Sequence, residues 1–168
     1  MINKRIFWMF RTDLTNLEYY HEFKDLKTFE NNCHDFYLLM PLFFIKNNDF
    51  DEAIIWRMYP EKKDDIIFNI GEKRFIQRWV KDFNEVFEYE KPDVSFFRGG
   101  FQIYCDITKK DPDFFGLKLY LGSSKRVIPK FGGIYDKILV EDDFDIFQYK
   151  GSIPFFKTAN EKIFRPLN

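Results

Sequence analysis

The sequence predicts a single α/β domain built on a mostly parallel, Rossmann-like sheet with helices on both faces. Three observations predict this class. Short apolar runs alternate with longer amphipathic stretches, several runs are continuously apolar, and turn residues close most of them. Continuous apolar runs are typical of parallel strands that are buried on both faces. Strand, turn and helix in alternation favour crossover units with helices on both sides. A chain of 168 residues is long enough to bury a substantial core in one domain, so we take residues 1–168 as a single unit.

The strands are expected at the apolar runs. These runs are residues 6–10, 53–58, 66–70, 94–97, 117–121 and 134–140, and residues 153–157 also look extended. Residues 36–44 fit either a strand or a short helix, because Pro41 interrupts an otherwise apolar run.

The helices are expected where apolar residues recur three or four positions apart. Residues 17–29 carry an aromatic stripe, and residues 102–109 predict a short helix. The clearest helical spacing is that of Phe75, Trp79, Phe83 and Phe87, with charged residues between them, and it ends before Pro92.

The composition is rich in phenylalanine. The chain has 23 Phe, and alanine occurs only at Ala53 and Ala159. The core must therefore consist of large aromatic side chains with few small ones. The surplus fits an aromatic core alone, or a core together with an exposed aromatic face on which a second domain or a second copy of the chain docks.

Charge and cysteine content exclude several classes of protein. The formal net charge of −1 argues against a dedicated nucleic-acid binder, which usually carries a basic excess. Cys33 and Cys105 have neither the spacing nor the neighbours of a structural zinc site. The apolar runs at residues 6–10 and 36–45 are too short for a signal peptide or a membrane span, so we expect a soluble, cytoplasmic protein.

The candidate binding residues follow strands. In parallel sheets, ligands bind at the carboxyl ends of the strands. Glycines there let a ligand approach the backbone, and cations or hydroxyls can hold an anion. The candidates that this reasoning selects are Arg11, Thr12, Arg98, Gly99, Gly100, Gly122, Ser123, Lys125 and Arg126. The alternative is a tight strand-to-helix turn at residues 98–100 and a polar loop at residues 122–126.

Candidate general bases are Asp13 and Asp106, each near a strand end. Turn or helix capping is the alternative role for both. The acidic cluster at residues 141–145 could hold a cation, but an acidic helix start explains it better. His21 and His34 have no recognisable catalytic partner.

Several stretches together resemble the N-terminal, Rossmann-like domain of GT-B glycosyltransferases of the group 1 type. They are Lys91-Pro92-Asp93-Val94 with Arg98-Gly99-Gly100, then Leu119 to Arg126 followed by Tyr135 to Val140, and finally Phe155 to Leu167. The last stretch looks like the segment that leads from the first domain of these enzymes to the second, so residues 152–168 are expected to be that crossover. The resemblance covers residues 90–168. The glycine-rich loop usual after the first strand is missing, since Arg11-Thr12-Asp13 stands there.

The resemblance implies acceptor recognition for transfer of a sugar from a nucleotide-sugar donor. Arg98, Lys125 and Arg126 would face phosphate charge, Gly99 and Gly100 would allow close approach, and Tyr104 could stack on a sugar ring. No metal or other cofactor is expected, because this type of enzyme generally needs none. The second domain of these enzymes, which makes most donor contacts, has no counterpart here. A non-catalytic protein-binding module and a small-nucleotide-binding regulator therefore remain alternatives.

Overall fold

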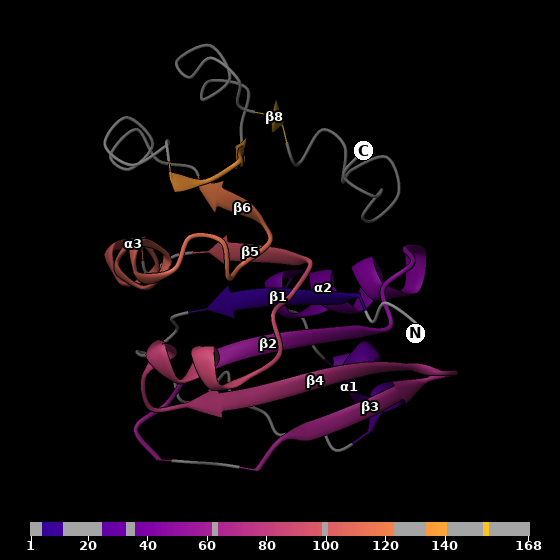
Figure 1. Cartoon of the computed structure of the whole chain (residues 1–168). Coiled ribbons are helices and arrows are strands. Elements are labelled where there is room, and N and C mark those ends of the chain that lie inside the picture. Colours follow the sequence, from indigo (N-terminus) through magenta and orange to yellow (C-terminus); the bar gives the residue numbers. More distant parts are fainter. Residues whose placement is uncertain are drawn as a thin grey trace.

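The computed structural model of the chain describes residues 5–11, 25–32, 36–61, 64–98, 101–122, 134–140 and 153–154. These residues form a sheet with helices packed on it (Figure 1).

The described residues contribute eight strands to one sheet, in the order β3-β4-β2-β1-β5-β6-β7-β8. The strands are β1 (Ile6–Arg11), β2 (Glu52–Met58), β3 (Ile66–Ile70), β4 (Lys73–Val80), β5 (Val94–Arg98), β6 (Leu117–Gly122), β7 (Lys137–Val140) and β8 (Ile153–Pro154). Every neighbouring pair is parallel except β3 and β4, which form an antiparallel hairpin. The prediction of a mostly parallel sheet is confirmed.

Helices cover both faces of the sheet, as predicted. Helices α1 (Leu26–Asn32) and α2 (Phe36–Asn47) pack on one face, where Phe29 and Leu42 join a core cluster with Phe7 and Phe75. Helix α3 (Phe101–Lys110) and the 3-10 helix η2 (Phe83–Glu88) cover the opposite face. In Figure 1, α1 and α2 lie behind the strands. We call these two surfaces the α1/α2 face and the α3 face.

The strand order is that of a Rossmann-like sheet. With the hairpin strand β3 and the two-residue edge strand β8 set aside, the parallel strands β4, β2, β1, β5, β6 and β7 are third, second, first, fourth, fifth and sixth along the chain. This is the 3-2-1-4-5-6 order of dinucleotide-binding folds. The order reverses between β1 and β5, which makes that junction the topological switch point, where open α/β sheets bind their ligands.

The core is aromatic on both faces. Phe7 stacks on Phe44 of α2 with ring centroids 4.3 Å apart, and Phe10 stacks on Phe97 at 4.8 Å on the α3 face. Among the described residues, the large hydrophobic side chains that remain exposed are Ile67, Tyr89 and Leu117, of which only Tyr89 is aromatic. No phenylalanine whose burial the structure describes is among the exposed residues, and most of these rings lie in the core.

The helix predicted over residues 75–87 is wrong. Residues 73–80 form strand β4, and a short 3-10 helix begins only at Phe83. A spacing of four residues satisfies a strand as well as a helix, because alternate residues of a strand share a face. Phe75 accordingly lies on the α1/α2 face, and Ile76 lies on the α3 face. Gly71 is the sequence feature that indicates a hairpin here, because its φ of 60° permits the tight turn between β3 and β4.

The ambiguity at residues 36–44 resolves as helix. Helix α2 continues through Pro41 to Asn47. Its carboxyl end is held by the Lys73 ammonium, which donates to the carbonyl oxygens of Ile45 (2.7 Å) and Asn48 (2.5 Å). A cation at this end satisfies carbonyl groups that have no partner inside the helix.

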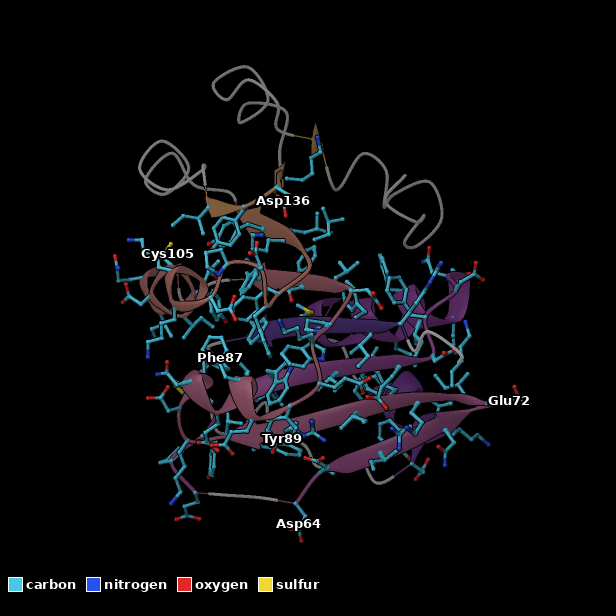
Figure 2. The ribbon with its side chains drawn as sticks, in the orientation of Figure 1. Asp64, Glu72, Phe87, Tyr89, Cys105 and Asp136 are labelled. Carbon is cyan, nitrogen blue, oxygen red and sulfur yellow. The ribbon has the colours of Figure 1, made fainter. Side chains whose placement is uncertain are left out.

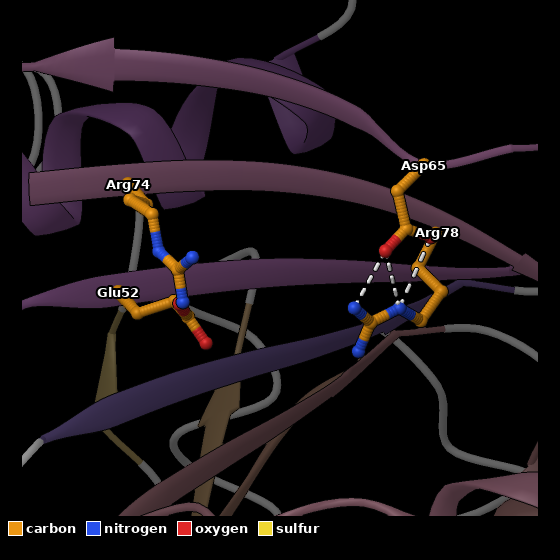
Figure 3. Close-up of polar contacts among 4 residues, drawn as sticks. All are labelled: Glu52, Asp65, Arg74 and Arg78. Carbon is orange, nitrogen blue, oxygen red and sulfur yellow. Dashed lines mark hydrogen bonds and ion pairs between the residues drawn. The ribbon is translucent and has the colours of Figure 1, made fainter.

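Two ion pairs bind β4 to its surroundings (Figure 3). Arg78 donates to both carboxylate oxygens of Asp65, with its Nη2 2.6 Å from Oδ2, and its guanidinium lies 4.3 Å from the Tyr89 ring centroid. Arg74 pairs with the buried carboxylate of Glu52 at the opposite end of the strand. Figure 2 shows Glu72 at the tip of the β3–β4 hairpin, beyond the Arg74 end of β4.

Asp93 ties the amino ends of three strands together. Its carboxylate accepts a hydrogen bond from the Ile6 amide (3.1 Å), and its carbonyl oxygen accepts one from the Leu117 amide (2.9 Å). The chain reaches Leu117 through Gly116, where φ is 61° and a Cβ would lie 2.3 Å from the Asp93 carbonyl oxygen. Only glycine fits this position without displacing backbone.

Replacement of Gly116 by alanine should therefore destabilise the protein strongly. We expect Gly116→Ala to lower the free energy of unfolding by about 3 kcal/mol, because the left-handed backbone and the overlap with Asp93 both penalise a Cβ. Gly71→Ala is the matched control. Gly71 has the same φ sign, but a Cβ added there would meet no atom within 4 Å, so the loss should be about 1 kcal/mol. Urea unfolding followed by tryptophan fluorescence measures both, and equal losses would contradict the steric argument.

Candidate functional site

Three arginine positions lie side by side at the carboxyl ends of neighbouring strands. Arg11 of β1 is the register partner of Arg57 in β2 and of Arg98 in β5. Since neighbouring strands run about 4.8 Å apart, the three positions form one short row across the sheet. The row spans the switch point between β1 and β5. We call Arg57, Arg11 and Arg98 the arginine row.

The sequence predicted two members of this row. Arg11 and Arg98 each end an apolar run, and the register brings these two strand ends together. Arg57 was missed because it was treated only as part of its strand. The sequence feature that could have identified Arg57 is its position, one residue before the end of a continuously apolar run. A cation at that place interrupts the apolar pattern.

The Arg57 side chain is buried, which is unusual for a cation. It is 3% exposed, and its guanidinium carbon lies 5.9 Å from the Trp79 ring centroid on β4. Arg57 and Trp79 are register partners, so both lie on the α1/α2 face. An aromatic ring beside a guanidinium both attracts it and restricts its orientation. Arg57 is thus a preoriented cation at the rim of the sheet.

Charged side chains stand at both ends of the sheet. Carboxylates bind backbone at the amino ends of strands, where Asp93 accepts from the Ile6 amide and Asp136 accepts from the Lys118 amide at 2.7 Å. Figure 2 labels Asp136 just before β7. The arginine row lies at the opposite, carboxyl end. Cationic positions grouped beside a switch point are an arrangement that suits an anionic ligand.

Tyr104 belongs to the core rather than to a surface. It is 0% exposed, its ring lies 5.3 Å from that of Phe97, and its hydroxyl donates to the Arg98 carbonyl oxygen at 3.3 Å. The predicted stacking on a sugar ring does not fit a ring with no exposed surface. Tyr104 instead fastens α3 to the end of β5, and so fixes the backbone that carries Arg98.

Asp106 lies on the exposed side of α3. Its carboxylate accepts a hydrogen bond from the Gln102 side chain, four residues earlier on the same helix, at 2.8 Å. Helix α3 covers the face opposite to Arg57. Asp106 therefore does not lie beside the arginine row, and its hydrogen bond is with a side chain of its own helix rather than with a helix cap.

The remaining candidates have only partial descriptions or none. Gly122 ends β6, the strand next to β5, so its backbone lies at the same end of the sheet as the arginine row. The other predicted residues lie outside the described residues; they are Thr12, Asp13, Gly99, Gly100, Ser123, Lys125 and Arg126. The same holds for His21, His34 and the acidic cluster at residues 141–145. Where the structure describes the chain, no three His, Cys, Asp or Glu side chains group as metal ligands would.

No protein-family model, curated protein or solved structure matches this chain. The fold and the arginine row are therefore the basis for assigning a function. Among the helices that the structure describes, none combines the length and apolar character needed to cross a membrane.

Cys105, labelled on α3 in Figure 2, is buried, and its Sγ lies 3.9 Å from the Tyr135 hydroxyl oxygen. Burial raises the pKa of the Cys105 thiol, and the hydrogen bond with Tyr135 offsets only part of this rise. Burial also raises the pKa of Tyr135. The folded state therefore favours the protonated thiol over the thiolate. The stability that this preference gives is fully present below the thiol pKa of the unfolded chain, and it is lost as the pH rises through the higher pKa of the folded state.

The Cys105 thiol should therefore resist alkylation in the folded protein. At about pH 8, near the ordinary thiol pKa, iodoacetamide should leave the Cys105 peptide unmodified in native protein and modify it fully in guanidinium chloride. Mass spectrometry of the digested protein measures both. Rapid native alkylation would show that the thiol is neither buried nor held as the protonated form.

Proposed function

We propose that this chain is the acceptor-binding domain of a GT-B type glycosyltransferase, and that it binds an anionic, sugar-bearing ligand at the carboxyl end of its sheet. The observation that carries the proposal is the arginine row at the switch point of a Rossmann-like sheet. The resemblance of residues 90–168 to the first domain of these enzymes supports the more specific assignment to sugar transfer.

Each part of the proposed site has a distinct role. The guanidinium group of Arg98 would bind anionic oxygens in a two-pronged fashion that lysine cannot reproduce. Gly99 and Gly100 would let the ligand approach the backbone at the start of α3, where amide groups add positive potential. Lys125 and Arg126, which follow β6 along the chain, would add positive charge. Transfer itself would need a second domain that supplies the donor contacts.

Amide NMR titration tests the proposal on the isolated chain. The probes are a panel of free oligosaccharides, sugar phosphates, and UDP- and GDP-sugars. We expect a sugar-bearing anion to perturb amides at the carboxyl ends of β1 and β5 and at the start of α3. Perturbations confined to the amino ends of the strands, near Asp93 and Gly116, would contradict the proposal, and so would the absence of any response to the whole panel.

A charge substitution gives the second measurement. Arg98→Gln should weaken binding of the responding ligand by about tenfold, because it removes a charge-assisted hydrogen bond. Lys137→Gln is the matched control, since Lys137 is an exposed cation at the amino end of β7. Isothermal titration calorimetry measures both dissociation constants. Equal weakening by the two substitutions would indicate a general charge effect and not a site at the switch point.

A further inference from the structure

Strand β3 lies at one edge of the sheet (Figure 1). Its inner side pairs with β4, and no strand that the structure describes pairs with its outer side. In Figure 2, Asp64 and Glu72 mark the two ends of this strand. An edge strand presents backbone N–H and C=O groups onto which a further strand can add. The sheet can therefore be extended at β3.

The hydrogen-bonding pattern of the hairpin indicates which backbone groups face outward. The two-residue loop Gly71-Glu72 joins β3 to β4, and Ile70 is the register partner of Lys73. A loop of two residues closes on a hydrogen-bonded pair, and such pairs then alternate along an antiparallel ladder. The even-numbered residues of β3 thus bond to β4, so the N–H and C=O groups of Ile67 and Asn69 point to the outer edge.

The two edge strands of the described sheet differ in their protection against pairing. Natural sheets protect their edges with short strands, proline, charged side chains or bulges. Strand β8, at the opposite edge, has two residues and ends in Pro154. Strand β3 has five residues with neither proline nor a charged side chain, and its continuous register with β4 leaves no bulge. Of these two edges, only that of β3 is suited to pairing.

Ile67 gives β3 an exposed apolar side chain on the α3 face. It is 47% exposed, and it lies on that face because its register partner Ile76 packs there. On the other face, Phe68 is buried and packs against Phe29 and Phe75. The α1/α2 side of β3 is thus filled by its own helix, whereas the α3 side has apolar surface that a partner strand would bury.

We propose that two copies of this chain pair through β3 in antiparallel orientation, with the two Ile67 residues opposite each other. A twofold axis perpendicular to the sheet then passes between these residues, and the two sheets become one continuous sheet. Outward-facing backbone groups meet outward-facing groups in this arrangement, which is the condition for a regular ladder. The inference goes beyond the proposed function and does not depend on it.

Side-chain chemistry selects this register among the antiparallel ones. The two Ile67 side chains bury each other, and Asn69 lies opposite Asp65 on both sides of the axis, where the amide can donate to the carboxylate. A shift of the partner by two residues in one direction places Asp64 opposite Glu72, and like charges in this relation destabilise a strand pair. The shift in the other direction places Asp65 opposite Ile67. Both shifts also separate the isoleucines.

The short ladder predicts a weak dimer. Two five-residue strands bury much less than the roughly 1,600 Å² of a standard interface, so we expect a dissociation constant on the order of 10 μM. The pairing leaves the arginine row uncovered by the partner strand, because β4 lies between β3 and the first strand of the row, β2.

Sedimentation velocity of the full chain, from about 1 μM to about 1 mM, tests the proposal. We expect monomer to convert to dimer as the concentration rises. Ile67→Lys places like charges opposite each other at the twofold axis, and it should weaken dimerisation by about tenfold or more. Leu117→Lys is the matched control, since Leu117 is 46% exposed but lies on β6, which has a neighbour on each side. It should leave the dissociation constant unchanged.

Disulfide formation tests the register and does not depend on the lysine variant. A hydrogen-bonded antiparallel pair has Cα atoms about 5.5 Å apart, which a disulfide can span. Ile67→Cys should therefore form a covalent dimer on mild oxidation. Asn69→Cys is the control, because the two Asn69 positions are offset by four residues, about 13 Å along the strands. The unsubstituted chain, which contains Cys33 and Cys105, gives the background.

Three results would overturn the proposal. They are a monomer throughout the concentration range, a dimer that Ile67→Lys weakens no more than Leu117→Lys does, and cross-linking of Asn69→Cys as fast as that of Ile67→Cys. Hydrogen exchange identifies the cause of the first result. Protected Ile67 and Asn69 amides in a monomer would show that another segment of the same chain covers the edge.

Discussion

The burial of β1 between two neighbouring strands and two helical layers underlies the whole fold. Residues 6–10 are at most 1% exposed, and they pack aromatic side chains alternately onto the α1/α2 face and the α3 face. A strand in this position can only be apolar within the sheet, since a polar side chain would be desolvated on either face. Its first polar residue, Arg11, is therefore forced to the strand end.

The same constraint applies to β2 and β5, and it explains why the arginine row exists as a row. Each of these strands is buried along most of its length, and each carries an arginine at its last or second-last position. Parallel pairing then brings the three strand ends into register. Carboxylates occupy the opposite end, where Asp93 and Asp136 bind backbone amides. Three arginine positions thus stand together beside the switch point.

The aromatic composition has a mechanical consequence for this site. Because alanine is rare, aromatic rings fill most of the space between the sheet and its helices. Tyr104, for example, connects α3 to the strands beneath it. The Tyr104 hydroxyl donates a hydrogen bond to the backbone carbonyl oxygen of Arg98, so Tyr104 links α3 to the end of β5. Trp79 has the comparable relation to Arg57. Aromatic rings therefore contact two of the three positions of the arginine row, through the Arg57 guanidinium and the Arg98 backbone.

The pattern of residues along the chain was enough to predict the class of fold, most of the strands, and the position of Arg11 and Arg98 at strand ends. Those inferences depend on local burial, which the alternation of apolar runs and turns records directly. Three-dimensional pairing was needed to show that residues 73–80 form a strand, because their four-residue spacing fits both a helix and a strand, and only pairing with β2 and β3 selects one. Pairing was also needed to place Tyr104 in the core and to bring Arg57 beside Arg11. These properties arise from strand register between segments far apart in the chain, and no local pattern encodes register.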